Sequence, residues 1–266
     1  MSEPKVLFED HGNIAVIKLN RPEKRNALDP ETVLLFNDYS EKAKDPKYRA
    51  VVVTGDESAF CGGADLTAAM EGMGWESVEQ GLNEGYHVGL NNLVYMDKVV
   101  IAAVEGACAG IGCAYYLSSD ISVMAKSSFF QIGFSKIALI PDGGSNWLLT
   151  KVVGYQQAFR MAAEAKRVSA EECMNLGMCS EVCEDGQAFD TAMELAKHYA
   201  TLAPRAIFKT KHLMRDSFNK SYEDNLKAEA KMQEEMVGRK DNIEGVTAFI
   251  AVSYTHLRAH ETPEHL

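Results

Sequence analysis

Apolar runs separated by turn-forming residues are the main pattern in the first half of the chain. Three of these runs predict strands, at Asn13–Asn20, Ala50–Thr54 and Val99–Val104, and a shorter strand is expected at Asp120–Met124. The run at Ala50–Thr54 has no charged side chain, so we expect that strand to be buried. Helical stretches lie between the runs, and strands that alternate with helices predict βαβ units around a central sheet.

Helix-start signals place the first and last helices. Asp29 is expected to be an N-cap with Pro30 at the first helical position, and this helix should end near Lys44. A capping box is predicted at Ser169–Glu172. Beyond it the pattern becomes helical, and the expected helices cover Gly186–Leu202, Pro204–Asp216 and Tyr222–Val237, with another capped start at Asp241.

This pattern predicts an α/β core over residues 1–195 and a helical region over 196–250. Residues 251–266 hold three of the seven histidines and show no apolar periodicity, so we expect a disordered or partly ordered tail that is foreign to the fold. Residues 67–90 combine Met70, Met73, Trp75 and Tyr86 with several glycines. Two readings stay open for that segment: a mobile wall over an apolar ligand, or a partly exposed amphipathic helix.

Composition and charge narrow the class of protein. Hydrophobic residues make up 46% of the 266 positions and charged residues 24%, which is typical of a globular chain with a large core. The formal net charge of −11 argues against nucleic-acid binding, because phosphate neutralisation needs a basic face. No apolar run is long enough to cross a bilayer, and the first five residues do not resemble a secretory signal. We therefore expect a cytoplasmic protein without membrane association.

Six cysteines lack the paired spacing of a zinc site, so we expect free thiols and no bound metal.

A stretch of small residues from Gly106 to Ala114 carries the first candidate chemistry. It follows a buried apolar run and is expected to form a turn that opens a helix. The first N–H groups of a helix have no internal partner and lie at the positive end of the helix dipole, so they bind anions or an oxygen that becomes negative during a reaction. No Asp, Glu, His or Lys lies between Gly106 and Ser119. Proton transfer must therefore come from another segment.

Several motifs in order along the chain resemble those of the crotonase, or enoyl-CoA hydratase/isomerase, superfamily. The likeness extends from about Val6 to Phe249. The motifs that carry it are Asn20–Leu28, Ala59–Leu66, Val104–Gly106 with Gly110–Cys113 and Ser119–Asp120, Ile140–Gly144, and Ser169–Glu172 with Leu176–Gly177.

The resemblance implies a fold, a substrate class and a set of site residues. The implied fold is a ββα spiral core with a C-terminal helical region for trimerisation, in homotrimers or dimers of trimers. The implied substrate is a coenzyme A thioester, with no separate cofactor, whose carbonyl oxygen would be held by the N–H groups of Ala64 and Ile111. The positions that match the family's substrate and CoA contacts are Lys24, Arg25, Ala27, Asp65, Leu66 and Gly110. For Asp65, holding its turn is the expected role of the carboxylate.

Two carboxylates of a typical hydratase in this family are absent. By the motif alignment they would fall at Ala114 and Phe134, and neither side chain transfers a proton. Asp142 is the remaining candidate acid, at a position used by enoyl-CoA isomerases and, with its surrounding sequence, similar to ring-epoxide isomerases of phenylacetyl-CoA breakdown. An apolar surround from Phe134, Ile137, Leu139 and Trp147 would raise its pKa toward neutrality.

Asp142 also has a purely structural interpretation. An Asp before Gly-Gly-Ser is a good N-cap that accepts from the N–H of Gly144 or Ser145. Three functions therefore stay open: double-bond isomerisation by Asp142, which the missing carboxylates favour, hydration or another crotonase reaction, and acyl-CoA binding without catalysis.

Overall fold

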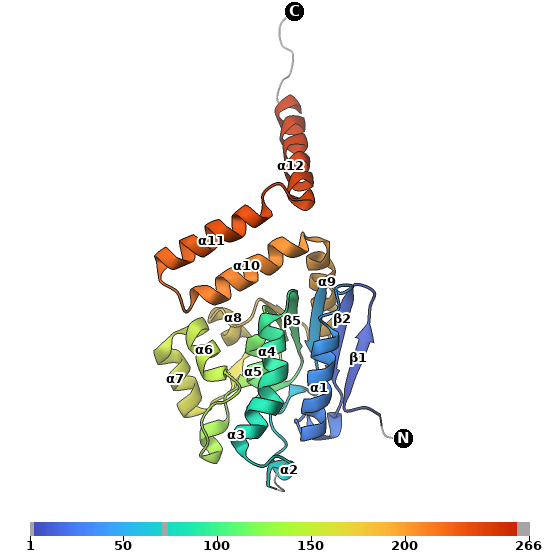
Figure 1. Ribbon diagram of the computed structural model, residues 1–266. Coiled ribbons are helices and arrows are strands. Elements are labelled where there is room, and N and C mark those ends of the chain that lie inside the picture. Colours follow the sequence, from blue (N-terminus) through green and yellow to red (C-terminus); the bar gives the residue numbers. More distant parts are fainter. Residues whose placement is uncertain (1–2, 71–73, 260–266) are drawn as a thin grey trace, which may run out of the picture. The chain divides into compact units, whose positions relative to one another are not determined.

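The structure is a computed structural model that describes residues 3–70 and 74–259 (Figure 1). The chain divides into two compact units, Met1–Pro204 and Arg205–Leu266. The first unit extends past the boundary at residue 195 that the sequence suggested. The reason is α9 (Ala188–Thr201), which packs on the central sheet and so belongs to the core.

A six-stranded sheet forms the centre of the first unit. Its first two strands are antiparallel, and every later neighbour is parallel. The strands, in their order across the sheet, are β1 (Val6–Asp10), β2 (Ile14–Leu19), β3 (Ala50–Thr54), β5 (Val99–Val104), β7 (Ile121–Ala125) and β10 (Glu181–Cys183). The four predicted strands are therefore confirmed as β2, β3, β5 and β7.

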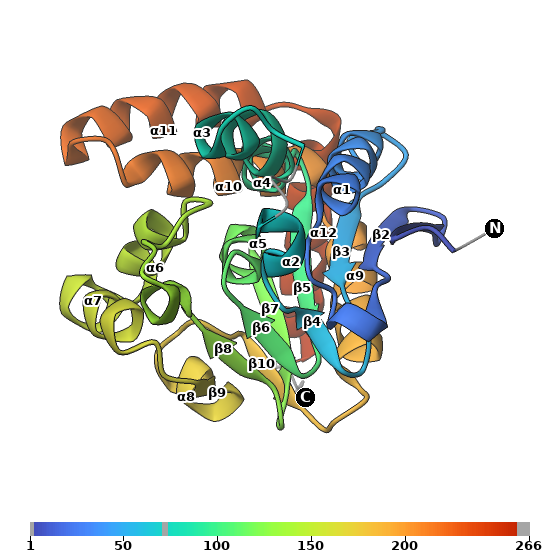
Figure 2. The same ribbon diagram turned by 90° about the horizontal axis from the view of Figure 1, so that it is seen from below.

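A second, four-stranded sheet was not predicted. Its strands, which lie side by side in Figure 2, are β4 (Ala59–Cys61), β6 (Ala107–Ala109), β8 (Phe129–Gln131) and β9 (Val168–Ser169). The expectation of one uninterrupted turn from Gly106 is wrong, because Ala107–Ala109 pairs in parallel with both β4 and β8. Strands of two or three residues are too short for a period-2 pattern to reveal them.

Successive strands alternate between the two sheets. β3, β5 and β7 join the six-stranded sheet, and the strand that follows each of them joins the four-stranded sheet. A helix comes after each pair: α2 (Leu66–Met70), α5 (Gly112–Ser118), and η3 (Phe134–Ile137) with α6 (Ser145–Val153). This repeated strand–strand–helix path is the ββα spiral that the motifs implied.

Helices cover both faces of the six-stranded sheet (Figure 1). α1 (Pro30–Lys42) packs on β1 and β2 and contributes Phe36 to the core cluster that also contains Val51. The next residue, Val52, faces the opposite side of the strand and does not belong to that cluster, but it is just as buried. α9 packs against the same strand. β3 is therefore buried on both faces, which explains its lack of charged residues. The predicted cap is present, since Asp29 Oδ1 accepts from the N–H of Thr32 at 2.9 Å.

Within the described part of residues 67–90, α2 ends at Met70, residues 74–77 form no helix, and three consecutive helices begin at Val78, so the segment is not one continuous helix. Met70 is 90% exposed, Tyr86 is buried, and Met73 lies outside the described residues. The remaining helices of the first unit are η1 (Pro22–Lys24), α3 (Val78–Gln80), the π-helix η2 (Gly81–Tyr86), α4 (His87–Tyr95), α7 (Tyr155–Glu164) and α8 (Ala170–Asn175). The capping box at the start of α8 is confirmed in both directions between Ser169 and Glu172.

The second unit is helical, as expected. It comprises α10 (Pro204–Ser217), α11 (Tyr222–Met236) and α12 (Lys240–Ala259), and Lys209 Nζ lies 2.7 Å from Glu235 Oε2 between the first two. The predicted start at Asp241 is wrong, because α12 already includes Lys240. Of the atypical tail expected from residue 251, the part up to Ala259 belongs to α12, and residues 260–266 lie outside the described part.

Candidate active site

Backbone hydrogen bonds orient the first candidate oxyanion donor, Ala64. The N–H of Leu28 donates to the carbonyl of Gly63 at 2.8 Å, and the N–H of Asp65 donates to the carbonyl of Leu28 at 2.9 Å. Within residues 3–70 and 74–259, the N–H of Ala64 itself makes no hydrogen bond. The turn therefore uses the groups on either side of Ala64 and leaves this donor available.

The second candidate donor, Ile111, lies where β6 ends and α5 begins. The N–H of Gly110 donates to the carbonyl of Gln131 at 3.0 Å, and the N–H of Ala114 donates to the carbonyl of Ile111 at 2.9 Å. No hydrogen bond from the N–H of Ile111 is present in the described part of the chain. The position is thus a helix start with an unused donor, as the sequence predicted.

The two turns are in direct contact, and only glycine permits the approach. A β-carbon at Gly112 would lie 2.7 Å from Cys61 Cβ, and one at Gly63 would lie 3.1 Å from the carbonyl oxygen of Ala109. Gly63 also has φ +102°, which L side chains rarely adopt. Each of the adjoining turns thus carries an N–H donor without a partner among the described residues, and such donors are what an oxyanion site requires.

The loop that carries Asp142 packs against the second turn. Gly143 has φ +61°, and a β-carbon there would lie 2.8 Å from Ala114 Cβ and 3.2 Å from Ile111 Cγ1. A residue with a side chain at position 143 would meet Ala114, so this approach needs glycine in the loop. The loop with Asp142 is therefore packed against Ala114, one of the two positions at which the expected carboxylate is absent.

The carboxyl of Asp142 is poorly solvated and does not cap a helix. Its Oδ1 is buried and accepts no hydrogen bond from any described residue. Burial raises its pKa from 3.8 to about 6, and a hydrogen bond from its own backbone N–H offsets only part of this rise. The capping interpretation is wrong: Gly144 is the N-cap of α6, and the N–H of Ser145 donates to the main-chain carbonyl of Asp142 at 3.0 Å.

The apolar surround of Asp142 differs in part from the expected one. Phe134 is buried, but Ile137, Leu139 and Trp147 are 47%, 58% and 42% exposed. Two buried tyrosines, on η2 and α5, belong to the surround instead. Burial is the main cause that raises the pKa of both Tyr86 and Tyr115, and the charge of Asp142 adds to it in each case. The sequence offered no spacing rule that links these phenols to the acid.

The positions expected to contact CoA differ in how exposed they are. Lys24 and Arg25 are exposed, and the carbonyl of Arg25 accepts from the N–H of Gly62 at 2.8 Å, so this segment lies beside the Ala64 turn. Leu66 is 53% exposed, while Ala27 and Gly110 are partly buried. Asp65 is only 7% exposed, and its carboxylate is already bound.

The bonds of Asp65 confirm its expected structural role. Its Oδ2 accepts from Arg21 Nη2 at 3.0 Å, and its Oδ1 accepts from the N–H groups of Thr67 and Ala68 at 3.1 and 3.3 Å. Burial opposes ionisation, but these bonds outweigh it and lower the pKa of Asp65. Its carboxylate holds the turn.

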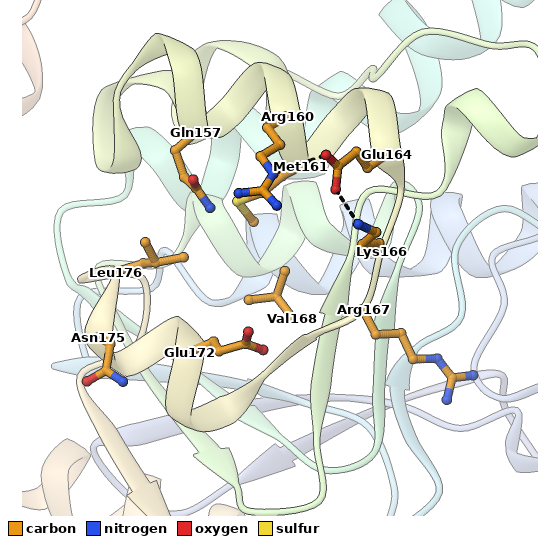
Figure 3. Close-up of a pocket in the computed structure, with 10 residues that line it drawn as sticks. All are labelled: Gln157, Arg160, Met161, Glu164, Lys166, Arg167, Val168, Glu172, Asn175 and Leu176. Carbon is orange, nitrogen blue, oxygen red and sulfur yellow. Dashed lines mark hydrogen bonds and ion pairs between the residues drawn. The ribbon is translucent and has the colours of Figure 1, made fainter.

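Several pockets formed by described residues lie outside the paired turns, and two of them adjoin α7. One, of about 310 Å³ between α7 and α8, is shown in Figure 3; Glu164 pairs there with Arg160 and Lys166, and no predicted site residue lines it. The other, of about 340 Å³, is largely apolar and includes Pro141 and Ser145, which flank the Asp142 loop. The described residues contain neither a group of three or more potential metal ligands nor a helix able to span a membrane.

The ββα spiral and the paired turns define a crotonase-type protein. A family described as enoyl-CoA hydratase/isomerase matches residues 9–254, and the chain therefore belongs to this family of acyl-CoA enzymes.

Relatives with different names share this similarity. The chain is 32% identical over 250 residues to the 1,2-epoxyphenylacetyl-CoA isomerase of Escherichia coli, covering 92% of this chain and 95% of that protein. It is 34% identical over 251 residues to a probable enoyl-CoA hydratase of Rhodobacter capsulatus, covering 94% and 96%. Among solved structures, an enoyl-CoA hydratase from Polaromonas sp. has a TM-score of 0.88 at 29% identity, covering 92% and 96%. These names include both an isomerase and hydratases.

Proposed function

We propose that the protein is an enoyl-CoA isomerase of the Δ3 to Δ2 type, with Asp142 as its one proton-shuttling carboxylate. The observation that carries this proposal is the placement of Asp142. Its Oδ1 is buried with no partner among the described residues, the loop that carries it packs against Ile111 and Ala114, and positions 114 and 134 offer no carboxylate. One acid beside an oxyanion site is sufficient for a double-bond shift.

The chemistry needs one group that acts first as a base and then as an acid. The N–H groups of Ala64 and Ile111 hold the thioester carbonyl oxygen while the Asp142 carboxylate removes a proton from C2 of a 3-enoyl chain. The electrons move into a dienolate, and the resulting acid delivers the proton to C4, which leaves a 2-enoyl thioester. A pKa near 6 suits both steps, because the carboxylate predominates at neutral pH and its conjugate acid is still strong enough to donate.

A ring substrate is a variant of the same proposal. The Escherichia coli relative is named for the isomerisation of 1,2-epoxyphenylacetyl-CoA, and the segment from Phe134 to Asp142 resembles that branch. The largely apolar pocket beside Pro141 supports an apolar acyl group, linear or aromatic.

Hydration is the second candidate function. The probable hydratase of Rhodobacter capsulatus and a carnitinyl-CoA dehydratase of Salmonella enteritidis, 31% identical over 245 residues, favour it by similarity. The chemistry of the site opposes it, because the two positions at which a typical hydratase activates water hold Ala114 and Phe134. Acyl-CoA binding without catalysis is the third candidate.

Turnover of two substrates separates these functions. Incubation with a 3-enoyl-CoA should give the 2-enoyl isomer, whereas a 2-enoyl-CoA should gain no water. Asp142→Asn should lower the isomerisation rate at least ~1,000-fold and leave CoA-thioester affinity within ~3-fold, because it removes the proton carrier and keeps the shape. Asp38→Asn, an exposed change on α1, is the matched control. Undiminished activity of Asp142→Asn would exclude Asp142, and water addition would establish the hydratase.

The proposal includes CoA binding, assembly and location. Lys24, Arg25 and Ala27 are proposed to line the CoA path without a further cofactor, in a cytoplasmic homotrimer or dimer of trimers. Exposed apolar side chains in the second unit support assembly, since Tyr222 is 73% and Phe249 77% exposed. Sedimentation equilibrium should give three or six chains per particle, and a monomer would contradict this part.

A further inference from the structure

Arg21 is a buried cation that the proposed chemistry does not use. Its residue is only 8% exposed, yet it carries a permanent charge. Its Nη2 lies 3.0 Å from Asp65 Oδ2 and 3.3 Å from Asp29 Oδ2, and its Nη1 donates to the carbonyl of Ala27 at 2.5 Å. One guanidinium therefore joins three points on two segments that are far apart in the sequence.

These three points surround the backbone pairing that orients Ala64. Leu28 and Ala64 form a parallel bridge. Ala27 precedes Leu28 and Asp29 follows it, while Asp65 follows Ala64. The guanidinium thus holds both chains immediately beside the bridge.

The bridge sets the direction of the Ala64 donor. The carbonyl of Gly63 and the N–H of Ala64 belong to one planar, trans peptide unit, so they point in opposite directions. When the N–H of Leu28 donates to that carbonyl at 2.8 Å, it fixes the plane of the unit and polarises it, which strengthens Ala64 as a donor.

The carboxylates that pair with Arg21 stay ionised over a wide pH range. Burial alone would raise the pKa of Asp29, but hydrogen bonds from Lys5 and Thr32 and the charge of Arg21 lower it to about 2. Lys5 Nζ lies 2.6 Å from Asp29 Oδ2, which supplies a second cation beside Asp29. The pairs remain ionised at any pH at which the enzyme is expected to work.

We propose that Arg21 is a positioning residue for catalysis: by bridging Asp29 and Asp65 it keeps the Ala64 N–H directed at the thioester oxygen. The inference rests on the proposed role of Ala64 as an oxyanion donor. A lysine would not replace Arg21, because a single ammonium lacks the planar fork that reaches two carboxylates and a carbonyl together.

The test reads carbonyl polarisation directly. Butyryl-CoA labelled with ¹³C at the carbonyl has no double bond to move, so its infrared carbonyl stretch reports the oxyanion site without turnover. In the wild type the stretch should fall on binding. In Arg21→Met the carbonyl stretch should return part of the way toward its value in solution, while kcat for a 3-enoyl-CoA falls ~10- to 100-fold and KM changes less than ~3-fold.

Lys5→Met is the matched control. It removes the other cation near Asp29 without touching Asp65, and its carbonyl stretch and kcat should equal those of the wild type.

Each outcome has a defined meaning. If the wild type shows no shift on binding, the oxyanion assignment of the proposed function fails. If the wild type shows the shift and folded Arg21→Met retains it with full kcat, the inference about Arg21 is overturned. If Arg21→Met does not fold, Asp65→Asn decides, because asparagine still caps α2 but loses the ion pair. A carbonyl stretch equal to that of the wild type in Asp65→Asn would also overturn the inference.

Discussion

The paired turns and the Asp142 loop meet at Gly143 but are stabilised in opposite ways. In the turns, the groups that flank each donor are bonded: Leu28 binds the Gly63 carbonyl, and Gln131 binds the Gly110 N–H. In the loop, the Asp142 carboxyl has an oxygen that is buried without a partner among the described residues. The groups beside the neutral donors are hydrogen-bonded, whereas the carboxyl of the acid has an oxygen without a hydrogen bond from a described residue.

The difference follows from what each group must do. A donor to an oxyanion is effective when it needs no reorganisation, so full bonding around it is useful. A proton shuttle must exist in two charge states of similar free energy, and poor solvation of the carboxylate brings them together. Changes in the turns should therefore act through geometry, and changes at Asp142 through protonation.

Gly112→Ala should have the largest effect. Its new β-carbon would lie 2.7 Å from Cys61 Cβ and 2.8 Å from the Cys61 carbonyl oxygen, so the two turns must separate. We expect kcat to fall ~100-fold or more and the free energy of unfolding to fall by about 1–3 kcal/mol. Gly133→Ala, which has no neighbouring atom within 4 Å and no positive φ, is the control. Normal turnover in Gly112→Ala would show that the contact is not needed.

The pH dependence should report the acid alone. With a pKa of about 6, Asp142 is the base only when ionised, so kcat/KM should fall about tenfold per pH unit below 6 and level off above it. Asp29 and Asp65, with lowered pKa values, stay ionised throughout this range. Initial rates from pH 5 to 9 test this, and a flat profile across pH 6 would argue against Asp142 as the base.

Asp142→Asn should stabilise the folded state at neutral pH. The pKa of Asp142 is higher in the folded than in the unfolded chain, so ionisation of this carboxyl lowers the free energy of unfolding. This loss is absent below about pH 4, grows between about pH 4 and pH 6, and is constant above about pH 6. We expect a gain of roughly 1–3 kcal/mol at pH 8 that shrinks as the pH falls toward 4. Urea unfolding at both pH values measures it, and an equal gain at both would assign it to another cause.

Thiol modification should have the smallest effect. Burial raises the pKa of Cys61 to about 12, and Cys108 and Cys113 are buried beside the same turns. Because the thiolate is the reactive form, iodoacetamide at pH 8 should leave these three cysteines unmodified in the native protein and activity unchanged. Peptide mass spectrometry checks this, and rapid labelling of Cys61 would show that the turns open readily.

Local chemistry explains which elements were predictable. The Asp29 cap and the Ser169–Glu172 box depend on residues three positions apart, so the chain alone reveals them. The strand at Ala50–Thr54 was also predictable from near neighbours, because five consecutive residues without a charged side chain indicate a buried strand. The motifs likewise located Ala64, Ile111 and Asp142, since each lies inside a short segment of recognisable sequence.

The sequence by itself determined the central strands, the helix starts at Asp29 and Ser169, and the positions of the candidate donors and acid. Only the tertiary structure decided that Ala107–Ala109 is a strand, that Asp142 leaves an oxygen unpaired rather than capping α6, and that Arg21 bridges Asp29 to Asp65. The physical reason is distance along the chain. Caps and periodicity depend on near neighbours, whereas strand pairing, burial and ion pairs depend on segments that only the fold brings together.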